Sequence, residues 1–447
     1  MNPDLHSFRF TRRQALVAGG LGTVGLALPQ LLRAEAGSRV RTQKSVILVV
    51  AWGGPSQHDT FDPKPDAPAE VRSVYGHIAT RTPGLRVGEH LPRLAERSNL
   101  FSVIRSVSHH VGVHHGATHY ALTGHPPKVA NAELTKASRA DHPTLGSVLA
   151  KVSPSAGSQP SFIQLPHTFV DQGIYSNGQN AGFLGIGFDP LVVTQDPKSG
   201  VFGVAGTTPS KDVDGERLDD RRRLLDQIDA RADRLSTALV AQDRDVCYRK
   251  AFDLLRSAGD NRALDLTRES DRLRDRYGRG VGQSLLVARR LVESGVRLVM
   301  VNDANNNMKW DTHDPKYGGG IDRNLRESDQ GLSALLDDLS TRDMLDSTLV
   351  VWMGEFGRTP RRKPDGGRDH WSKCYSALMA GGGIQGGRVH GSSDPLGAYP
   401  RDGLVRPEDV HATIYHLLGI PLDTELHDTL GRPYPLCTGS PINSSLL

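Results

Sequence analysis

Cysteine is scarce in this sequence, and its scarcity excludes two classes of protein. Only Cys247, Cys374 and Cys437 occur among 447 residues, so neither a disulfide framework nor a cysteine-based zinc motif can be built. An excess of one charge is also missing, because 54 basic residues face 50 acidic ones and leave a net charge of +4 at pH 7. This near balance gives no electrostatic argument for binding nucleic acid.

The N-terminus lacks an apolar run long enough to span a bilayer comfortably. The weakly apolar run 15–28 follows the pair Arg12-Arg13. This pattern predicts a twin-arginine export signal over residues 1–36 and therefore a periplasmic or extracellular protein. The alternative is an N-terminal membrane anchor. The signal holds four arginines and two acidic residues, so residues 37–447 have a net charge of only +2, and we expect no stable transmembrane segment in them.

Short, unbroken apolar runs predict buried strands, and the segments between them carry helical patterns. The predicted strands are 45–52, 100–107, 161–165, 296–301, 349–353 and 375–379. The predicted helices are 116–122, 143–152, 281–293, 321–345 and 407–418. This alternation predicts an α/β fold with a mostly parallel central sheet flanked by helices.

Two segments depart from this alternation. Residues 166–210 are rich in Gly, Pro, Asn and Asp, and we interpret them as an irregular excursion on the substrate side. From about 211 to 280 leucines recur at helical spacing among charges of both signs. This second pattern predicts a solvated helical insertion in a single domain that covers residues 37–447.

Carboxylates and imidazoles follow three of the predicted strands. Asp59 follows the first, Asp311 and His313 follow strand 296–301, and Glu355 and His370 follow strand 349–353. Ligands of open α/β sheets bind at the carboxyl ends of strands, so we expect these residues to form a metal site. Asp311 and His313 can share an ion because residues two apart in an extended loop point the same way. The structural alternatives are a turn-capping role for Asp59 and a charged surface loop over 354–371.

Histidines are concentrated after the second predicted strand. Six fall within seventeen residues: His109, His110, His114, His115, His119 and His125. On a helix, His115 and His119 share a face, as do His110 and His114 if the helix starts earlier. A single histidine is usually structural, but this density predicts metal or anion contact by at least one of them, with His115 a candidate metal ligand.

The donor set predicts the kind of ion. Carboxylates and imidazoles without thiolates suit zinc, manganese or iron, and calcium to a lesser degree. Two divalent ions would clamp a tetrahedral anion and stabilise the charge of an in-line displacement. Arg358, Arg361, Arg362 and Arg368 lie beside the candidate ligands in the sequence and could hold anion oxygens.

Several motifs together resemble a sulfatase-like family of bacterial exported proteins, domain of unknown function 1501, in the alkaline phosphatase and sulfatase superfamily. They are GGPSQHDTFDPKPDAP, EHLPRL, HHGATHYALTGHPP, LLVARRLVESGVRLVMV with WDTHD, GEFGRTPRR with GRDHW, and DVHATIYHLLGI. The resemblance covers nearly all of residues 45–435. It implies an alkaline phosphatase-like sandwich with two metal ions. Asp311, His313 and His370 would hold one ion, and Asp59 with Glu355 the other.

The resemblance also implies a hydrolase of sulfate or phosphate esters that acts on a small molecule or a polysaccharide. The ALTGHPP turn is similar to the sulfatase motif LLTGRYP, and counting back from it puts the nucleophile position at His114. Thr118 or Ser108 could replace that nucleophile, or a metal-bound hydroxide could attack directly. Arg358 is the candidate anion holder, and Asp369 is expected to orient its neighbours. The alternative is a non-catalytic metal- or ligand-binding scaffold with a degenerate site.

Overall fold

The computed structural model describes most of the predicted domain. It covers residues 43–129, 137–156, 159–171, 173–195, 200–204, 262–304, 310–313, 321–442 and 446, and the single positions 216, 217, 220, 223, 224 and 227. The predicted export signal and most of the predicted helical insertion therefore lie outside the described residues.

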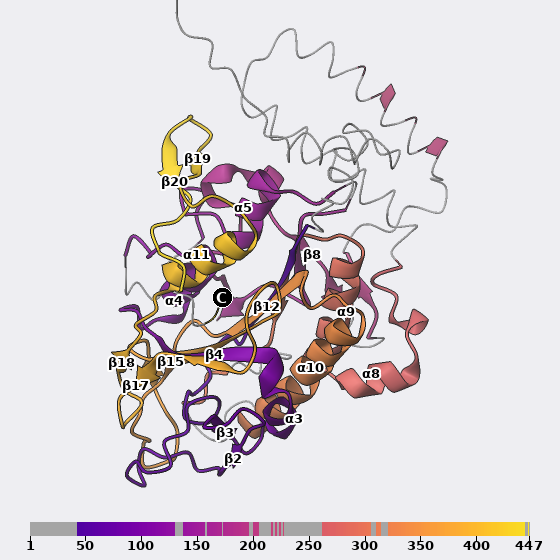
Figure 1. Ribbon diagram of the computed structural model, residues 1–447. Coiled ribbons are helices and arrows are strands. Elements are labelled where there is room, and N and C mark those ends of the chain that lie inside the picture. Colours follow the sequence, from indigo (N-terminus) through magenta and orange to yellow (C-terminus); the bar gives the residue numbers. More distant parts are fainter. Residues whose placement is uncertain are drawn as a thin grey trace, which may run out of the picture. The chain divides into compact units, whose positions relative to one another are not determined.

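Eight strands form the central sheet, in the order β16-β4-β15-β12-β1-β11-β5-β8 (Figure 1). They are β1 (Ser45–Val50), β4 (Phe101–Val107), β5 (Phe162–Leu165), β8 (Leu191–Val192), β11 (Leu298–Asn302), β12 (Thr348–Met353), β15 (Tyr375–Ala380) and β16 (Arg388–His390). Neighbouring strands pair in parallel except β15, which is antiparallel to both β12 and β4. The mostly parallel sheet is confirmed, and the carboxyl ends of all strands but β15 lie along one edge.

Helices cover both faces of this sheet, as predicted (Figure 1). They are α3 (Pro92–Glu96), α4 (His114–Thr123), α5 (Leu145–Val152), α8 (Asp271–Tyr277), α9 (Val281–Glu293), α10 (Ile321–Thr341) and α11 (Pro407–Leu417). Strand β1 shows why two helical layers are needed, because every one of its residues is buried. Ile47 and Val49 face a core shared with α9 and α10, while Val46 and Leu48 face a core shared with α4, α5 and α11.

Several helix boundaries differ from the sequence prediction, and those of α10 and α4 matter most. Helix α10 ends at Thr341, four residues early, shortly before Asp343, which has a positive φ of 55°. Helix α4 begins at His114 and not at residue 116, so its first turn contains two histidines. It ends at Gly124, whose φ of 72° is left-handed and whose N–H bonds to the carbonyl of Tyr120.

Short antiparallel strand pairs form separate two-stranded sheets outside the central sheet. They are β2 (His77–Ala79) with β3 (Arg86–Gly88), β6 (Val170–Asp171) with β7 (Ile174–Tyr175), β9 (Thr194–Gln195) with β10 (Phe202–Gly203), β13 (Gly357–Arg358) with β14 (His370–Trp371), β17 (Ser392–Ser393) with β18 (Pro400–Asp402), and β19 (Glu425–His427) with β20 (Pro433–Pro435). The β13–β14 pair joins the two ends of the Arg-rich loop after β12. It therefore brings His370 back to the edge where β12 ends.

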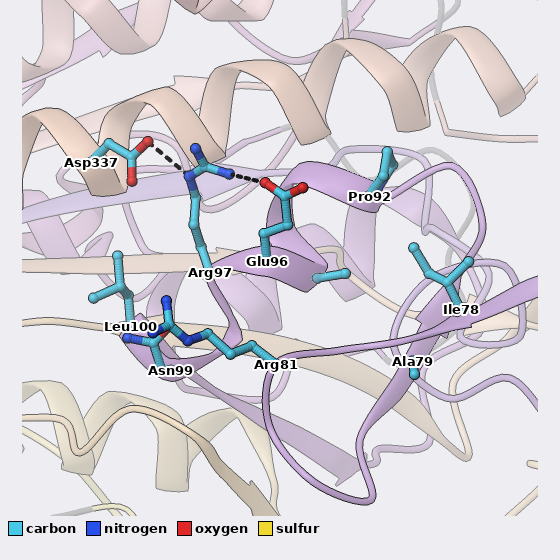
Figure 2. A pocket seen from close by; sticks show the side chains of 10 residues that line it. Ile78, Ala79, Arg81, Pro92, Glu96, Arg97, Asn99, Leu100 and Asp337 are labelled. Atoms are coloured by element: carbon cyan, nitrogen blue, oxygen red, sulfur yellow. Dashed lines mark hydrogen bonds and ion pairs between the residues drawn. The ribbon is translucent and has the colours of Figure 1, made fainter.

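A hollow of about 770 Å³ lies beside α3 and α10 (Figure 2). Arg97 projects from its wall and bonds to Asp337 of α10 and to Glu96. None of the residues predicted to bind metal or substrate lines it, so we assign it no part in the chemistry. In the part of the chain that the structure describes, no helix combines the length and hydropathy needed to cross a bilayer.

Candidate metal centre

Three imidazole rings converge on the carboxylate of Asp311. The Nε2 atoms of His313 and His370 lie 3.1 and 3.2 Å from its Oδ1, and Nε2 of His114 lies 3.3 Å from its Oδ2. These residues come from the loop after β11, from β14 and from the start of α4. We call the four residues His114, Asp311, His313 and His370 the Asp311 centre.

The other ring nitrogen of each histidine faces an acceptor outside the centre. Nδ1 of His114 lies 2.6 Å from Oε1 of Glu355, and Nδ1 of His313 lies 2.8 Å from Oδ1 of Asp369. Nδ1 of His370 lies 3.0 Å from the carbonyl of Gly112. An acceptor on Nδ1 fixes the ring orientation and leaves Nε2 available, which is the usual arrangement around histidines that bind metal ions.

Glu355 is held by the backbone of the first strand's loop. Its side chain is fully buried, and the N–H of Gly53 donates to both of its carboxylate oxygens, at 2.9 and 3.0 Å. Gly53 has a φ of +116°, and a Cβ on it would lie 2.5 Å from the backbone nitrogens of Trp310 and Asp311. Only glycine fits here, so this position joins the loops that follow β1, β11 and β12.

His109 and Phe356 contact the residues that form or orient the centre. Nε2 of His109 lies 2.7 Å from the backbone carbonyl of Glu355. Burial lowers the pKa of His109 to about 4, so this ring is neutral. The fully buried ring of Phe356 lies 4.5 Å from the ring of His370 and 5.0 Å from that of His114. The apolar ring of Phe356 therefore packs against two imidazoles of the centre.

The charges of the centre shift its pKa values strongly. Burial by itself would lower the pKa of His114, but hydrogen bonds to Asp311 and Glu355 raise it to about 9. Burial would raise the pKa of Asp311, but the close imidazoles of His114 and His370 and the charge of Arg358 hold it far below its usual range. The pKa of His370 is lowered, chiefly by burial. A metal ion binds the deprotonated forms of such groups and would replace the proton on His114.

The donor set fits a divalent ion of the first transition row. One donor atom each of His114, Asp311 and His370 lies within 4.8 Å of the others, and no second group of three such donors occurs among the described residues. Three imidazole nitrogens and a carboxylate oxygen are ligands that zinc takes at about 2.0–2.2 Å.

The structure gives Asp59 and Glu355, which were expected to share a second ion, different partners. The hydroxyl of Ser73 donates to Oδ1 of Asp59, and Oδ2 lies 3.9 Å from Nε of Arg368. Glu355 instead accepts from Gly53 and contacts His114, because β12 ends opposite the start of α4. Asp59 is therefore placed in a buried ionic contact, and Glu355 in a position that orients a ligand.

Arg358 and Arg368, which were expected to hold anion oxygens, bond to other groups of the chain in the structure. The guanidinium of Arg358 is fully buried and donates to the carbonyls of Gly53, Gly54 and Arg368 and, at 2.5 Å, to Oδ1 of Asp311. Arg368 donates to the carbonyls of Val71, Arg72, Thr359 and Pro360. Both arginines fix loops by bonding to backbone, and Arg358 also locks the carboxylate of the centre.

The remaining candidate site residues lie on helix α4, and their contacts differ. His114 opens the helix and reaches the centre, while His115 is buried and is not among the three grouped donors. Thr118, one turn after His114, is fully buried, and its hydroxyl oxygen accepts a hydrogen bond from the indole N–H of Trp52 at 3.0 Å. The alternative nucleophile is therefore held in a structural contact.

Sequence reasoning did not find the positioning roles of Gly53, His109 and Phe356. All three lie within quoted motifs or clusters, but nothing in their spacing shows which side chain each would contact. His114 was identified from the motif, although as the position of a nucleophile and not as a metal-type donor.

The fold and this site define an α/β protein with a candidate metal centre at the carboxyl edge of its sheet. The chain belongs to the family described as "Protein of unknown function (DUF1501)", whose model matches residues 43–446. No curated protein matches it.

Solved structures resemble the chain only distantly. One is a protein in the alkaline phosphatase superfamily from Vibrio parahaemolyticus, with 12% identity, a TM-score of 0.39, and coverage of 85% of this chain and 67% of that chain. The PsFucS1 sulfatase from Pseudoalteromonas sp. has 13% identity, a TM-score of 0.38, and coverage of 87% and 70%. The lipoteichoic acid synthase LtaP from Listeria monocytogenes has 12% identity, a TM-score of 0.34, and coverage of 85% and 72%. Similarity at this level carries no argument about function.

Proposed function

We propose that this protein is an exported, metal-dependent hydrolase of sulfate or phosphate esters. The observation that carries the proposal is the convergence of His114, His313 and His370 on Asp311, with an acceptor behind each ring. The ester class is supported by the resemblance of the ALTGHPP turn, residues 121–127, to a sulfatase motif. Export is supported by the twin-arginine pattern at Arg12-Arg13.

The chain's own residues have separate roles in this proposal. Nε2 of each of the three histidines and the carboxylate of Asp311 would bind one divalent ion. Bound there, the ion would act as a Lewis acid on the ester. Glu355 orients His114, Asp369 orients His313, and Arg358 keeps the carboxylate of Asp311 in place.

We propose water as the attacking nucleophile. The hydroxyl of Thr118 is buried against Trp52, and His114 is occupied by two carboxylates. Neither residue is placed to form a covalent ester intermediate. The proposal therefore replaces the sulfatase-type covalent step with direct hydrolysis, and it replaces the expected pair of ions with one.

Metal content and turnover together test this proposal. Protein loaded with zinc or manganese and then dialysed is expected to retain about one ion per chain by mass spectrometry, and to hydrolyse 4-nitrophenyl sulfate or 4-nitrophenyl phosphate until a chelator is added. Asp311→Asn should lose both properties. Asp59→Asn, a matched change outside the centre, should keep the ion. Absence of bound metal in the loaded wild-type protein would refute the proposal.

A second candidate is a binding or scaffold protein that retains the metal centre without catalysis. Two observations favour it. Position 114, where a sulfatase has its nucleophile, holds a histidine, and the hydroxyl of Thr118 is bonded to the indole of Trp52. One retained ion without turnover of either aryl ester would support this candidate over the hydrolase. The natural substrate of the hydrolase would be a sulfated or phosphorylated small molecule or polysaccharide.

A further inference from the structure

A pair of polar side chains lies at the carboxyl ends of β11 and β5, beyond the Asp311 centre. Asn302 is the last residue of β11, and His167 follows β5 by two residues. Nδ2 of Asn302 lies 3.0 Å from Nδ1 of His167. Asn302 is only 2% exposed, yet its Oδ1 has no hydrogen-bond partner, and neither has the buried Nε2 of His167. Buried polar atoms without partners are uncommon in folded proteins and call for a ligand or water.

The pair offers one donor and one acceptor whichever way it is protonated. Burial lowers the pKa of His167, although a hydrogen bond to the carbonyl of Thr168 opposes this, so the ring is neutral near pH 7. If the amide of Asn302 donates to Nδ1, the ring proton is on Nε2, Oδ1 of Asn302 is the remaining acceptor, and the 3.1 Å contact of Nδ1 with the carbonyl of Thr168 is not a hydrogen bond. If the amide is flipped and accepts from Nδ1–H, its nitrogen becomes the donor and Nε2 the acceptor. Both states are complementary to a hydroxyl group, which donates one hydrogen bond and accepts another.

The loop that carries His167 is fixed by buried amides. Oε1 of Gln179 accepts from the N–H of Phe169 at 2.7 Å and from Nε2 of Gln164 at 2.9 Å. Nε2 of Gln179 donates to the carbonyls of Phe169 and Ser176, both at 2.9 Å. Because the loop is already ordered, a ligand that binds His167 loses little free energy in ordering it. His167 is half-buried, so it forms the side of the pair that is nearest to solvent.

Trp52 connects this pair to the Asp311 centre. Strands β1 and β11 are neighbours, with Val50 opposite Asn302. Trp52 continues from β1, and its ring lies 6.4 Å from the ring of His114 and 5.3 Å from that of Phe169. Trp52 therefore contacts both His114 of the centre and Phe169 of the loop that carries His167, at the same edge of the sheet.

We propose that Asn302 and His167 form a recognition subsite for a hydroxyl group of the substrate. The ester cleaved at the Asp311 centre is then carried by a polyhydroxylated molecule such as a sugar. This inference rests on the proposed hydrolase function, because it names the part of the substrate that lies next to the reacting ester.

Substitution of His167 tests the subsite with two substrates of the same ester class. His167→Phe keeps the ring shape and removes both hydrogen-bonding atoms, whereas His167→Gln keeps a donor and an acceptor. With zinc-loaded protein, we expect His167→Phe to raise KM for glucose 6-sulfate about tenfold, as loss of a hydrogen bond to a substrate hydroxyl does, and to leave kcat/KM for 4-nitrophenyl sulfate within about twofold. His167→Gln should restore most of the sugar-ester activity.

His416→Phe, which changes an exposed histidine on α11, is the matched control. If sulfate esters are not turned over, the same pair of assays uses glucose 6-phosphate and 4-nitrophenyl phosphate.

A binding measurement keeps this test independent of turnover. Histidine ring resonances of zinc-loaded protein are recorded during titration with glucose 6-sulfate or glucose 6-phosphate, with inorganic sulfate or phosphate as control. The resonances missing in His167→Phe identify His167, and we expect them to shift with a sugar ester and not with the inorganic anion.

The outcomes separate this inference from the proposed function. Equal losses on sugar and aryl esters would make the pair structural and overturn the subsite. No shift of the His167 resonances with either sugar ester would mean that the pair binds only water, and would also overturn it. Loss of turnover on every ester together with a shift at His167 would refute the hydrolase and keep the subsite.

Discussion

Helix α4 contributes one histidine to each of two histidine groups, and these groups differ in what surrounds them. His114 at the first turn joins the Asp311 centre, where carboxylates contact its ring on both sides. His119, five residues on, belongs to a group formed with His125, His142 and His411, which we call the distal histidine group. The rings of His125 and His142 are stacked with centroids 3.9 Å apart.

Among the residues that the structure describes, no carboxylate bonds to the distal histidine group. Nδ1 of His119, His142 and His411 is buried without a hydrogen-bond partner. Burial lowers the pKa of His119 and His411 to about 4 and that of His142 to about 3, whereas carboxylates raise the pKa of His114 to about 9. Helix α4 therefore carries a metal-type donor, His114, in its first turn and a neutral core histidine, His119, further along. The contacting carboxylates, and not the number of histidines, decide the difference.

Removing the carboxylate of Asp311, which three histidines contact, should have the largest effect on zinc affinity. Asp311→Asn replaces the group on which three Nε2 atoms converge with a neutral amide, so we expect zinc affinity to fall by more than the roughly 10- to 100-fold that loss of an orienting partner gives. Titration with zinc in competition with a chelator measures this. Asp141→Asn, a matched change beside the distal histidine group, should bind zinc like the wild type. Equal affinities of Asp311→Asn and wild type would show that the centre does not bind metal.

Removing the carboxylate of Glu355, which orients His114, should lower zinc affinity less than the change at Asp311 does. In Glu355→Gln the side chain loses its negative charge beside His114 and one of the two oxygens that accept from Gly53, although an oxygen at the Oε1 position can still contact both residues. We expect zinc affinity to fall about 10- to 100-fold. Glu408→Gln, which changes a carboxylate that accepts from Tyr120, is the control. If Glu355→Gln abolished binding as fully as Asp311→Asn, Glu355 would be a ligand and the proposed division of roles would be wrong.

Acid should destabilise the protein through the distal histidine group. His119 has a pKa of about 4 in the folded chain and 6.5 as its ordinary value, so the unfolded state binds more protons between these values. The free energy of unfolding therefore falls as pH drops from 6.5 towards 4, by on the order of 1–2 kcal/mol for this group at pH 5. His119→Leu should flatten that pH dependence in urea unfolding of metal-free protein. His416→Leu on the exposed face of α11 should leave it unchanged. Identical slopes for wild type and His119→Leu would contradict the assignment.

The fold was predictable because its strands are buried on both faces. Runs such as 45–52 and 349–353 are continuous in β-branched and apolar residues, and such runs predict parallel strands under helices. The antiparallel direction of β15 was not predictable. Its apolar sequence resembles that of its parallel neighbours, and only its pairing with β12 and β4 distinguishes it.

The site was predictable in its residue types and less so in its geometry. Asp311, His313 and His370 were identified because they follow strands, and the structure brings them together. The partners of Asp59 were not predictable, because position after a strand says nothing about where the loop then turns. The side chain of Asp59 turns towards Ser73, while that of Glu355 turns towards the start of α4. Such pairings depend on contacts between loops far apart in sequence.

The smallest expected effect concerns Thr118, which lies on α4 between the two histidine groups. Thr118→Val has nearly the same shape and loses the hydroxyl that accepts from Trp52, so we expect the free energy of unfolding to fall by about 1 kcal/mol. Zinc affinity and turnover of an aryl ester should stay within about twofold of the wild type, because the hydroxyl bonds to an indole and not to a reacting group. Thr118→Ser keeps the hydroxyl and serves as the control in the same unfolding and activity measurements. Loss of turnover in Thr118→Val with zinc still bound would instead identify Thr118 as the nucleophile, and α4 would then supply both a ligand and a covalent catalyst within one turn.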